Sequence, residues 1–391
     1  MKNKKNLILI LGLLAFMTNG DNYAAAPLLL KISEDLGINL QQAAWSVTAY
    51  MLSFGVFTLI FGPLSDRYGK VKIISIAAFG TAIFSVFGGF SFNLPSLMFF
   101  RAMNGAFAAG VFPVTMALVG QSFDDKNRHK ALGKVMGLMF LGGATATAIG
   151  GILAYFGSWR FVYILYGIGE LVVAFIILKT LEQDKGIVSK LNFITAYKTP
   201  LSSFRFMRLV TVVFFVGLTV FGSFTYSGKL LQKITGYSVL QVGLILSFFG
   251  LGTVLGGRIA PKLKKIMKHG FLISAGIIGF IGLFILSRYT NVIILSSGLF
   301  LFGVAFIFLQ STLISTAQAK LPKMRGTAMS LASFNMFVGG AIGTALNGYI
   351  MEAGNINQIF YNSAFILLAV GLVAAFFIGR FEMRQAQKES A

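Results

Sequence analysis

The feature that most constrains the fold is a nearly continuous series of long apolar stretches. A helix that crosses a membrane needs about 20 mostly apolar residues. The 391-residue chain offers twelve such stretches, at roughly 6–29, 42–64, 72–92, 95–120, 131–156, 161–181, 208–231, 238–258, 268–287, 291–318, 326–351 and 357–379. Backbone groups in lipid must be hydrogen-bonded within the protein. We therefore predict an all-α membrane protein with twelve transmembrane helices and no soluble catalytic domain.

Composition excludes several classes of protein. Hydrophobic residues make up 56% of the chain, charged residues 12%, and the mean hydropathy is +0.80, which is unlike a soluble globular domain. The chain has no cysteine, so disulfides and thiol chemistry are excluded. Its two histidines, His129 and His269, fall in predicted polar loops. We expect neither a metal site nor a cofactor.

The net charge of +21 is distributed very unevenly. Threading the twelve helices from a cytoplasmic N-terminus leaves only a few basic residues on the far side: Lys31, Arg160, Lys229, Lys233 and Arg288. Excess Lys and Arg mark cytoplasmic loops, so we predict a multi-pass cell-membrane protein with both termini in the cytoplasm. The basic residues lie in loops rather than on one folded soluble surface, and no nucleic-acid partner is predicted.

The N-terminus resembles a secretory signal. Lys2, Lys4 and Lys5 precede an apolar run that ends near Ala24-Ala25-Ala26, a sequence similar to a cleavage site. The apolar run is long for a signal, and its removal would leave eleven helices. We interpret this stretch as the first transmembrane helix.

One long polar break divides the chain. It predicts an N-terminal six-helix bundle over 1–181, a cytoplasmic linker over 182–207, and a C-terminal six-helix bundle with a short tail over 208–391. Ile187, Leu191 and Phe193 alternate with basic residues in the linker, which favours a helix lying on the membrane surface. A disordered linker is the alternative.

A charged sequence, Gly62-Pro63-Leu64-Ser65-Asp66-Arg67-Tyr68-Gly69-Lys70, separates the second and third stretches. Its glycines allow a tight reversal. The sequence resembles the signature loop of the major facilitator superfamily, in its 12-helix drug:proton antiporter branch. This resemblance implies two pseudo-symmetric bundles that rock about a central site. It also implies a cytoplasmic gate formed by Gly62, Asp66, Arg67, Gly69 and Lys70, with Asp66 facing the helix that begins near Gly326.

Three ionisable residues, Asp21, Arg101 and Glu170, lie well inside the predicted hydrocarbon region. Such groups are costly in lipid and usually mark a functional or paired site. At about 1.5 Å per residue, Asp21 and Arg101 lie at a similar depth, roughly 20 Å from the cytoplasmic side. They can therefore pair across the first and fourth helices. A fixed salt bridge that only orients helices is the alternative to a functional pair.

Two short motifs favour function for these charges. Arg101-Ala102-Met103-Asn104-Gly105 looks like the R-x-x-[QN]-G element of the family, and Asp21 with Pro27 resembles a D…P pattern of drug exporters. The resemblance implies that Asp21 and Arg101 couple proton movement to transport. Glu170 lies near the middle of the sixth helix, which the resemblance would place at the bundle periphery, and is a third candidate for proton coupling.

Further residues are predicted to pack helices or line a cavity. Small residues allow close helix approach, and the packing candidates are Gly142, Gly150, Gly151, Gly339 and Gly343. The fifth helix lacks the Gly-Pro pair of the antiporter signature and has Ala146-Thr147 instead. We expect a large apolar cavity for hydrophobic or cationic compounds, lined by Tyr23, Tyr50, Met51, Asn104, Phe112, Tyr226, Phe306, Gln310, Phe334 and Asn335.

These observations favour a monomeric, proton-coupled exporter of small amphiphilic or cationic molecules, whose partners are its substrate, protons and the lipid bilayer. A dedicated metabolite, sugar or siderophore exporter or an uptake porter shares the same features. A lipid flippase is a further alternative, favoured by a cavity that opens sideways to lipid with basic head-group contacts. A membrane enzyme is disfavoured because no histidine, cysteine or paired-acid cluster lies in the membrane. A sensor would not need a buried titratable pair.

Overall fold

The computed structural model describes residues 4–123, 125–186, 193–268, 270–321 and 324–389. These residues form helices and turns without any strand. The helices are α1 (Lys4–Leu36), α2 (Leu40–Tyr68), α3 (Lys70–Gly88), α4 (Leu94–Ala108), α5 (Phe112–Ser122), α6 (Asp125–Phe156), α7 (Trp159–Thr180), α8 (Phe193–Ser202), α9 (Phe204–Thr235), α10 (Val239–Met267), α11 (Gly270–Arg288), α12 (Val292–Lys320), α13 (Arg325–Glu352) and α14 (Ile356–Glu389).

Twelve segments of these described residues are long and apolar enough to cross a membrane, with α4 and α5 together forming the fourth. The predicted all-α class with twelve transmembrane helices is confirmed. Helix α8 lies in the predicted linker, whereas Ile187 and Leu191 fall outside the described residues. His269 and the side chain of His129 fall outside them too.

Several helices run past the stretches that hydropathy predicts. Helix α1, predicted over 6–29, continues to Leu36, and α2 begins at Leu40 behind a capping box. The Asn39 side chain accepts from the Gln42 backbone N–H, and the Gln42 side chain accepts from the Asn39 backbone N–H. Hydropathy marks where the chain is apolar, whereas capping groups set where a helix ends.

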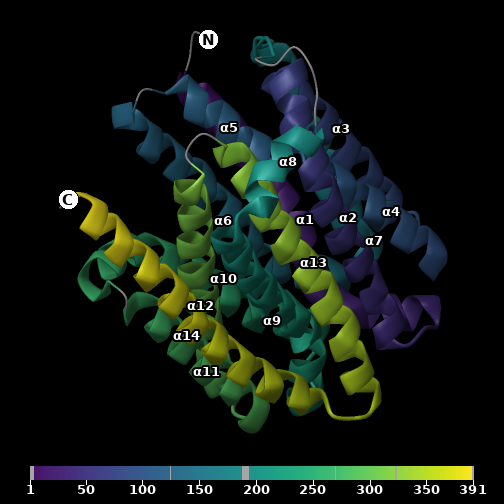
Figure 1. Ribbon diagram of the computed structural model, residues 1–391. Coiled ribbons are helices and arrows are strands. Elements are labelled where there is room, and N and C mark those ends of the chain that lie inside the picture. The colour runs from purple at the N-terminus through teal and green to yellow at the C-terminus, as the bar shows by residue number, and fades with distance from the viewer. Residues whose placement is uncertain (1–3, 124, 187–192, 269, 322–323, 390–391) are drawn as a thin grey trace.

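The helices form two groups that meet along a central seam (Figure 1). Helices α1–α7, purple to blue, pack mainly with one another, as do α9–α14, coloured teal to yellow. The groups touch chiefly where α2 packs on α13 and where α6 packs on α10. We call the membrane side where α1 begins and α8 lies the basic face, and the other side the opposite face.

Glycines allow close helix contacts within and between the groups. On α6, a methyl group at Gly142 would overlap the Phe16 backbone of α1, and Gly150 approaches Ala24. Gly151 meets Gly243 of α10, which joins the two groups. On α13, Gly339 and Gly343 approach the α9 backbone. Larger residues at these positions would force the helices apart.

The fourth span is not the continuous helix predicted over 95–120. It breaks at Ala109–Val111, between α4 and α5. Pro113 has no N–H and cannot bond the Ala109 carbonyl. The Thr58 hydroxyl of α2 donates to that carbonyl instead, at 3.5 Å. Proline is tolerated here because a neighbouring helix supplies the missing donor.

The charged sequence after the second span is also different from the predicted turn. Helix α2 continues through Pro63 to Tyr68, and only Gly69, at φ +93°, makes the reversal into α3. Gly62 instead lies against the Ser330 hydroxyl of α13. Pro63 frees the Leu59 carbonyl, which accepts a hydrogen bond of 2.7 Å from the Tyr197 hydroxyl of α8.

Candidate functional site

The structure brings Asp21 and Arg101 together inside the first group of helices. Arg101 Nη1 on α4 lies 3.2 Å from Asp21 Oδ1 on α1, and each side chain is only 1% exposed. A charge buried this deeply persists only when it is paired. Asp21 Oδ2 and two of the guanidinium nitrogens, Nε and Nη2, have no hydrogen-bond partner among the described residues. The pair therefore has hydrogen-bonding capacity that this conformation does not use.

Two tyrosine rings hold the guanidinium of Arg101. Its Cζ lies 4.4 Å from the ring centroid of Tyr50 on α2 and 5.0 Å from that of Tyr163 on α7. Cation–π contacts of this kind stabilise a cation where water is excluded. The rings also fix the plane of the guanidinium, so that its position depends on α2 and α7 together.

Asn104, predicted to line the cavity, belongs to this charged cluster. Its Oδ1 lies 3.4 Å from Arg101 Nη1, and its Nδ2 donates to the Thr81 carbonyl and hydroxyl of α3 at 2.9 and 3.0 Å. The amide thus links the ion pair to α3. Asn104 is fully buried.

Glu170 lies on the side of α7 that faces the interior of the first group, whereas Leu165, Ile168 and Val172 on the other side of this helix are exposed. The Glu170 side chain is fully buried and interacts electrostatically with Asp21 and Arg101. Gly20 of α1 packs on the Tyr166 ring and Gly169 of α7 packs on Met17, which draws the two helices together. Neither carboxylate oxygen of Glu170 has a hydrogen-bond partner among the described residues. The ionised form of this group is costly here.

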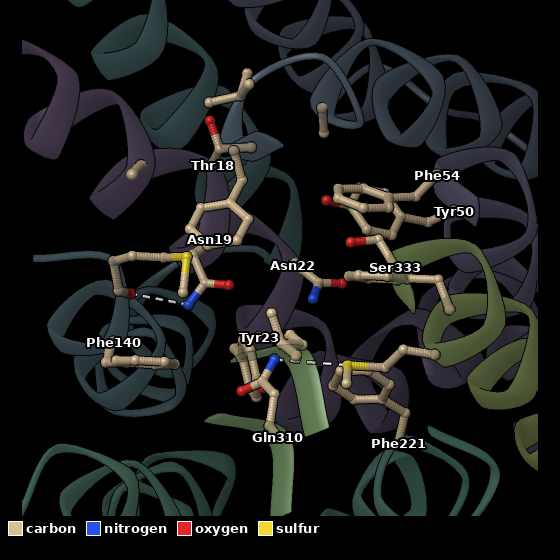
Figure 2. Close-up of a pocket in the computed structure, with 18 residues that line it drawn as sticks. Thr18, Asn19, Asn22, Tyr23, Tyr50, Phe54, Phe140, Phe221, Gln310 and Ser333 are labelled. Atoms are coloured by element: carbon tan, nitrogen blue, oxygen red, sulfur yellow. Dashed lines mark hydrogen bonds between the residues drawn. The ribbon is translucent and has the colours of Figure 1, made fainter. Parts of the chain in front are cut away.

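A central cavity lies between the two groups of helices (Figure 2). Its volume is about 70 Å³. Tyr50 lines it and also stacks on Arg101, so one ring separates the cavity from the ion pair. Three oxygen atoms in its wall, Thr18 Oγ1, Asn22 Oδ1 and Gln310 Oε1, have no hydrogen-bond partner among the described residues.

Some of the predicted cavity residues line this space and others do not. Tyr23, Tyr50, Phe112 and Gln310 line it, whereas Met51, Asn104, Tyr226, Phe306, Phe334 and Asn335 do not. Tyr226 instead donates to the Thr344 carbonyl, and Asn335 to the Leu331 carbonyl of its own helix. This central cavity, at about 70 Å³, is smaller than drug-sized pockets, which have volumes of roughly 300–1,000 Å³.

Several lining residues were missed by sequence reasoning, including Thr18, Asn22, Phe140, Phe221 and Ser333. Asn22 and Thr18 flank Asp21 on α1, and polar residues beside an intramembrane acid were a usable signal. The aromatic residues carried no such signal, since the chain contains 41 phenylalanines. On the side of α9 and α10, Tyr23 packs edge-on against Phe221 and Phe224, and Phe224 packs on Phe249.

At the basic face, the predicted gate residues meet the start of the linker. Asp66 is half-exposed and pairs with Lys70 at 3.4 Å. The Asp184 carboxylate accepts from the backbone N–H groups of Lys70 and Val71 at 2.9 and 2.8 Å, and so caps α3. Asp184 was missed by sequence reasoning, although α3 follows Gly69, which has no side chain to act as its cap. No cluster of three or more acidic or histidine residues that could ligate a metal occurs within the described ranges.

Twelve spans, two groups of helices and a central cavity beside buried charges define a membrane carrier. A family model described as "Major Facilitator Superfamily" matches residues 11–344. The chain belongs to this superfamily, and it is a multi-pass membrane transporter rather than an enzyme. The resemblance that the charged sequence at Gly62–Lys70 suggested is confirmed.

Curated relatives include several efflux proteins. The chain is 26% identical over 364 residues to the multi-drug resistance efflux pump PmrA of Streptococcus pneumoniae, covering 88% of this chain and 89% of the relative. It is 26% identical over 430 residues to the quinolone resistance protein NorB of Staphylococcus aureus, covering 94% and 92%. It is also 23% identical to YceJ, an uncharacterized MFS-type transporter of Bacillus subtilis, covering 86% and 87%.

Solved structures share the fold at low sequence identity. A bacterial homologue of the human lysosomal transporter Spinster, described as inward-facing and unoccupied, matches with a TM-score of 0.71 at 17% identity, covering 96% of both chains. The nucleoside transporter NupG matches with a TM-score of 0.75 at 14% identity, covering 96% of this chain and 100% of that chain.

Proposed function

We propose that this transporter is a monomeric, proton-coupled exporter of small amphiphilic or cationic compounds. The observation that carries the proposal is the buried Asp21–Arg101 pair, which only the Tyr50 ring separates from the central cavity. A group that binds a proton beside a substrate space can link the two events, because each alters the electrostatic field that the other experiences.

In the proposed cycle, protonation of Asp21 removes the negative charge that balances Arg101. The guanidinium then reorients, and Tyr50 moves with it because the two are stacked. Because Tyr50 lines the cavity, its movement changes the shape of the cavity wall. Glu170 provides a second proton-binding carboxyl close to the pair.

Alternating access would convert this local change into transport. The segments 1–181 and 208–391 act as rocking bundles, joined by the linker over 182–207. Gly62, Asp66, Arg67, Gly69 and Lys70 form the gate at the basic face, which faces the cytoplasm together with both termini. Loss of a gate contact should shift the balance of conformations and leave the binding site intact.

The cavity wall supports the proposed substrate class. Unpartnered oxygens of Thr18, Asn22 and Gln310 favour a ligand with hydrogen-bond donors. Rings of Tyr23, Phe221 and other aromatic residues favour an apolar or cationic body. Relatives named as a multidrug pump and a quinolone resistance protein support the same class. The cavity must widen to admit such a molecule, since its volume here is about 70 Å³.

The proposal can be tested in everted membrane vesicles with an acidified interior, using a pH-sensitive dye and a panel of lipophilic cations and neutral drugs. We expect substrate-induced proton release in the wild type and none in Asp21→Asn. Glu34→Gln is the matched control, because Glu34 is an exposed acid on the same helix. Proton release by Asp21→Asn equal to that of the wild type would exclude Asp21 as the coupling group.

A further inference from the structure

A second and much larger space lies between the two groups of helices at the basic face. This cleft has a volume of about 960 Å³ and is lined by α1, α6, α10, α11 and α12. Phe140 lines both the cleft and the central cavity, so the two spaces are neighbours. The room for a sizeable molecule is therefore in the cleft.

The cleft lies where α6 and α10 diverge: the two helices are in contact towards the opposite face and move apart towards the basic face. Towards the opposite face the two helices touch, with Gly151 against Gly243 and Gly250 against Ala144. Towards the basic face, Gly133 and Gly137 of α6 have no neighbouring atom within 4 Å of the position a side chain would take. Leu9 and Leu141 at the rim are 54% and 43% exposed. Apolar side chains this exposed on membrane-spanning helices indicate that the cleft is accessible from the surrounding lipid.

All the charged side chains that line the cleft are basic. Lys5, Lys134, Arg258 and Lys264 line it, and no aspartate or glutamate is among the described residues that do so. Lys134, Arg258 and Lys264 form no ion pair within the described part of the chain. The cations are near the membrane surface, where their charge attracts anionic lipid head groups.

Apolar side chains occupy the rest of the wall. Leu138, Val254 and Ile307 are among them, and they continue from the cations towards Phe140. A wall that is cationic at the membrane surface and apolar further in complements an anionic amphiphile. An inorganic anion would bind the cations but leave the apolar wall exposed.

We propose that this cleft binds an anionic phospholipid from the leaflet at the basic face. The phosphate lies among Lys134, Arg258 and Lys264, and one acyl chain follows the apolar wall towards Phe140. This lipid site does not depend on proton coupling, because its residues are separate from the Asp21–Arg101 cluster. A basic cleft open to lipid is also the feature that favours a lipid flippase as the alternative function.

The test uses purified full-length protein in detergent. Dioleoyl phosphatidylglycerol or dioleoyl phosphatidylcholine is titrated, and lipid binding is measured by native mass spectrometry alongside the unfolding temperature. The double variant Arg258→Gln/Lys264→Gln removes two cleft charges. The control, Lys262→Gln/Lys265→Gln, removes two exposed charges from the same end of α10 that do not line the cleft.

We expect the wild type and the control to bind phosphatidylglycerol more tightly than phosphatidylcholine, and the cleft variant to lose about thirtyfold in phosphatidylglycerol affinity. Equal losses in both double variants would overturn the proposal, since general surface charge would then account for binding. Equal affinity for the two lipids would also overturn it. Stabilisation by inorganic phosphate as large as that by the lipid would identify a free-anion site instead. Proton release in vesicles is measured separately, so failure of either proposal is distinguishable.

Discussion

At the scale of single residues, burial of Asp21 and of Arg101 each costs desolvation free energy. The attraction between the two charges offsets these costs only while both partners are present. Removing one partner of such a pair typically destabilises a protein by about 3–5 kcal/mol, because the other charge is left unpaired. Loss of transport in a single variant can therefore result either from lost stability or from a lost role of the residue in transport.

A comparison of variants separates these two roles. Arg101→Ala should lower the unfolding temperature strongly, by the equivalent of about 3–5 kcal/mol. Asp21→Asn/Arg101→Gln should recover most of that loss, because no buried charge remains, yet should stay inactive in proton release. Thermal unfolding in detergent and the vesicle assay measure the two properties. Recovery of proton release in the double variant would show that the pair only orients helices.

Position 101 requires arginine rather than lysine. The guanidinium lies over the Tyr50 and Tyr163 rings, whereas an ammonium group cannot stack in this way. Arg101→Lys should fold, keep the positive charge, and shift the pH at which proton release is half-maximal. An unchanged pH profile would mean that charge alone, without stacking, is sufficient at this position.

At the scale of helices, the linker helix α8 is attached to α2 through a proline. The Tyr197 hydroxyl supplies the donor that Pro63 lacks, and burial raises the pKa of Tyr197 to about 12. The raised pKa means that folding favours the protonated phenol. This contribution to stability is complete below the unfolded pKa of about 10 and is lost as the pH rises towards 12.

Tyr197→Phe should therefore weaken the attachment of α8 by about 1 kcal/mol, because the Leu59 carbonyl loses its partner. We expect faster tryptic cleavage of the linker at neutral pH with little change in substrate affinity. Tyr289→Phe is the control, since Tyr289 is an exposed tyrosine at the opposite face. Equal cleavage rates for the two variants would show that the hydroxyl does not hold α8.

The sequence predicted the twelve spans because lipid imposes one simple rule on every segment, namely length and apolarity. It also placed Asp21 and Arg101 at one depth, since depth depends only on position along a helix. It could not predict which side of a helix faces which neighbour. Glu170 is buried beside α1 because α1 and α7 interlock through Gly20 and Gly169. Asp184 and Tyr197 bond to backbone atoms, which leave no pattern in a sequence.

At the scale of the whole molecule, the two groups of helices are joined at the opposite face and parted at the basic face along α6 and α10. Besides Gly151 and Gly243, a polar contact joins the halves at the opposite face. The Glu352 carboxylate at the end of α13 accepts from Asn39 Nδ2 at 3.0 Å, and from Gln41 when its amide is oriented with nitrogen towards Glu352. This contact favours the conformation described here over one that opens the opposite face.

Glu352→Ala should shift the population towards opening at the opposite face. Spin labels on cysteines introduced at Glu34 and Thr290, both exposed at that face, would report the separation of the two groups. We expect a larger share of long distances in Glu352→Ala. Glu352→Gln keeps an acceptor for Asn39 and should be intermediate. Identical distance distributions in all three proteins would exclude the contact as a latch.

Orientation in the membrane can be tested simply because the chain has no native cysteine. Single cysteines at Lys185, on the basic face, and Asn355, on the opposite face, are both exposed. A membrane-impermeant maleimide should label Asn355→Cys in intact cells, and Lys185→Cys only after permeabilisation. Labelling of Lys185→Cys in intact cells would reverse the predicted orientation.

The unoccupied space beside Gly133 and Gly137 has a consequence for the speed of transport. If α10 packs against these glycines when the basic face closes, a lipid in the cleft and the closed seam exclude each other. Anionic lipid would then compete with closure of the basic face and slow each transport cycle, so that the turnover rate would depend on bilayer composition. We expect turnover in reconstituted vesicles to fall as the phosphatidylglycerol fraction rises, and Arg258→Gln/Lys264→Gln to be insensitive to that fraction.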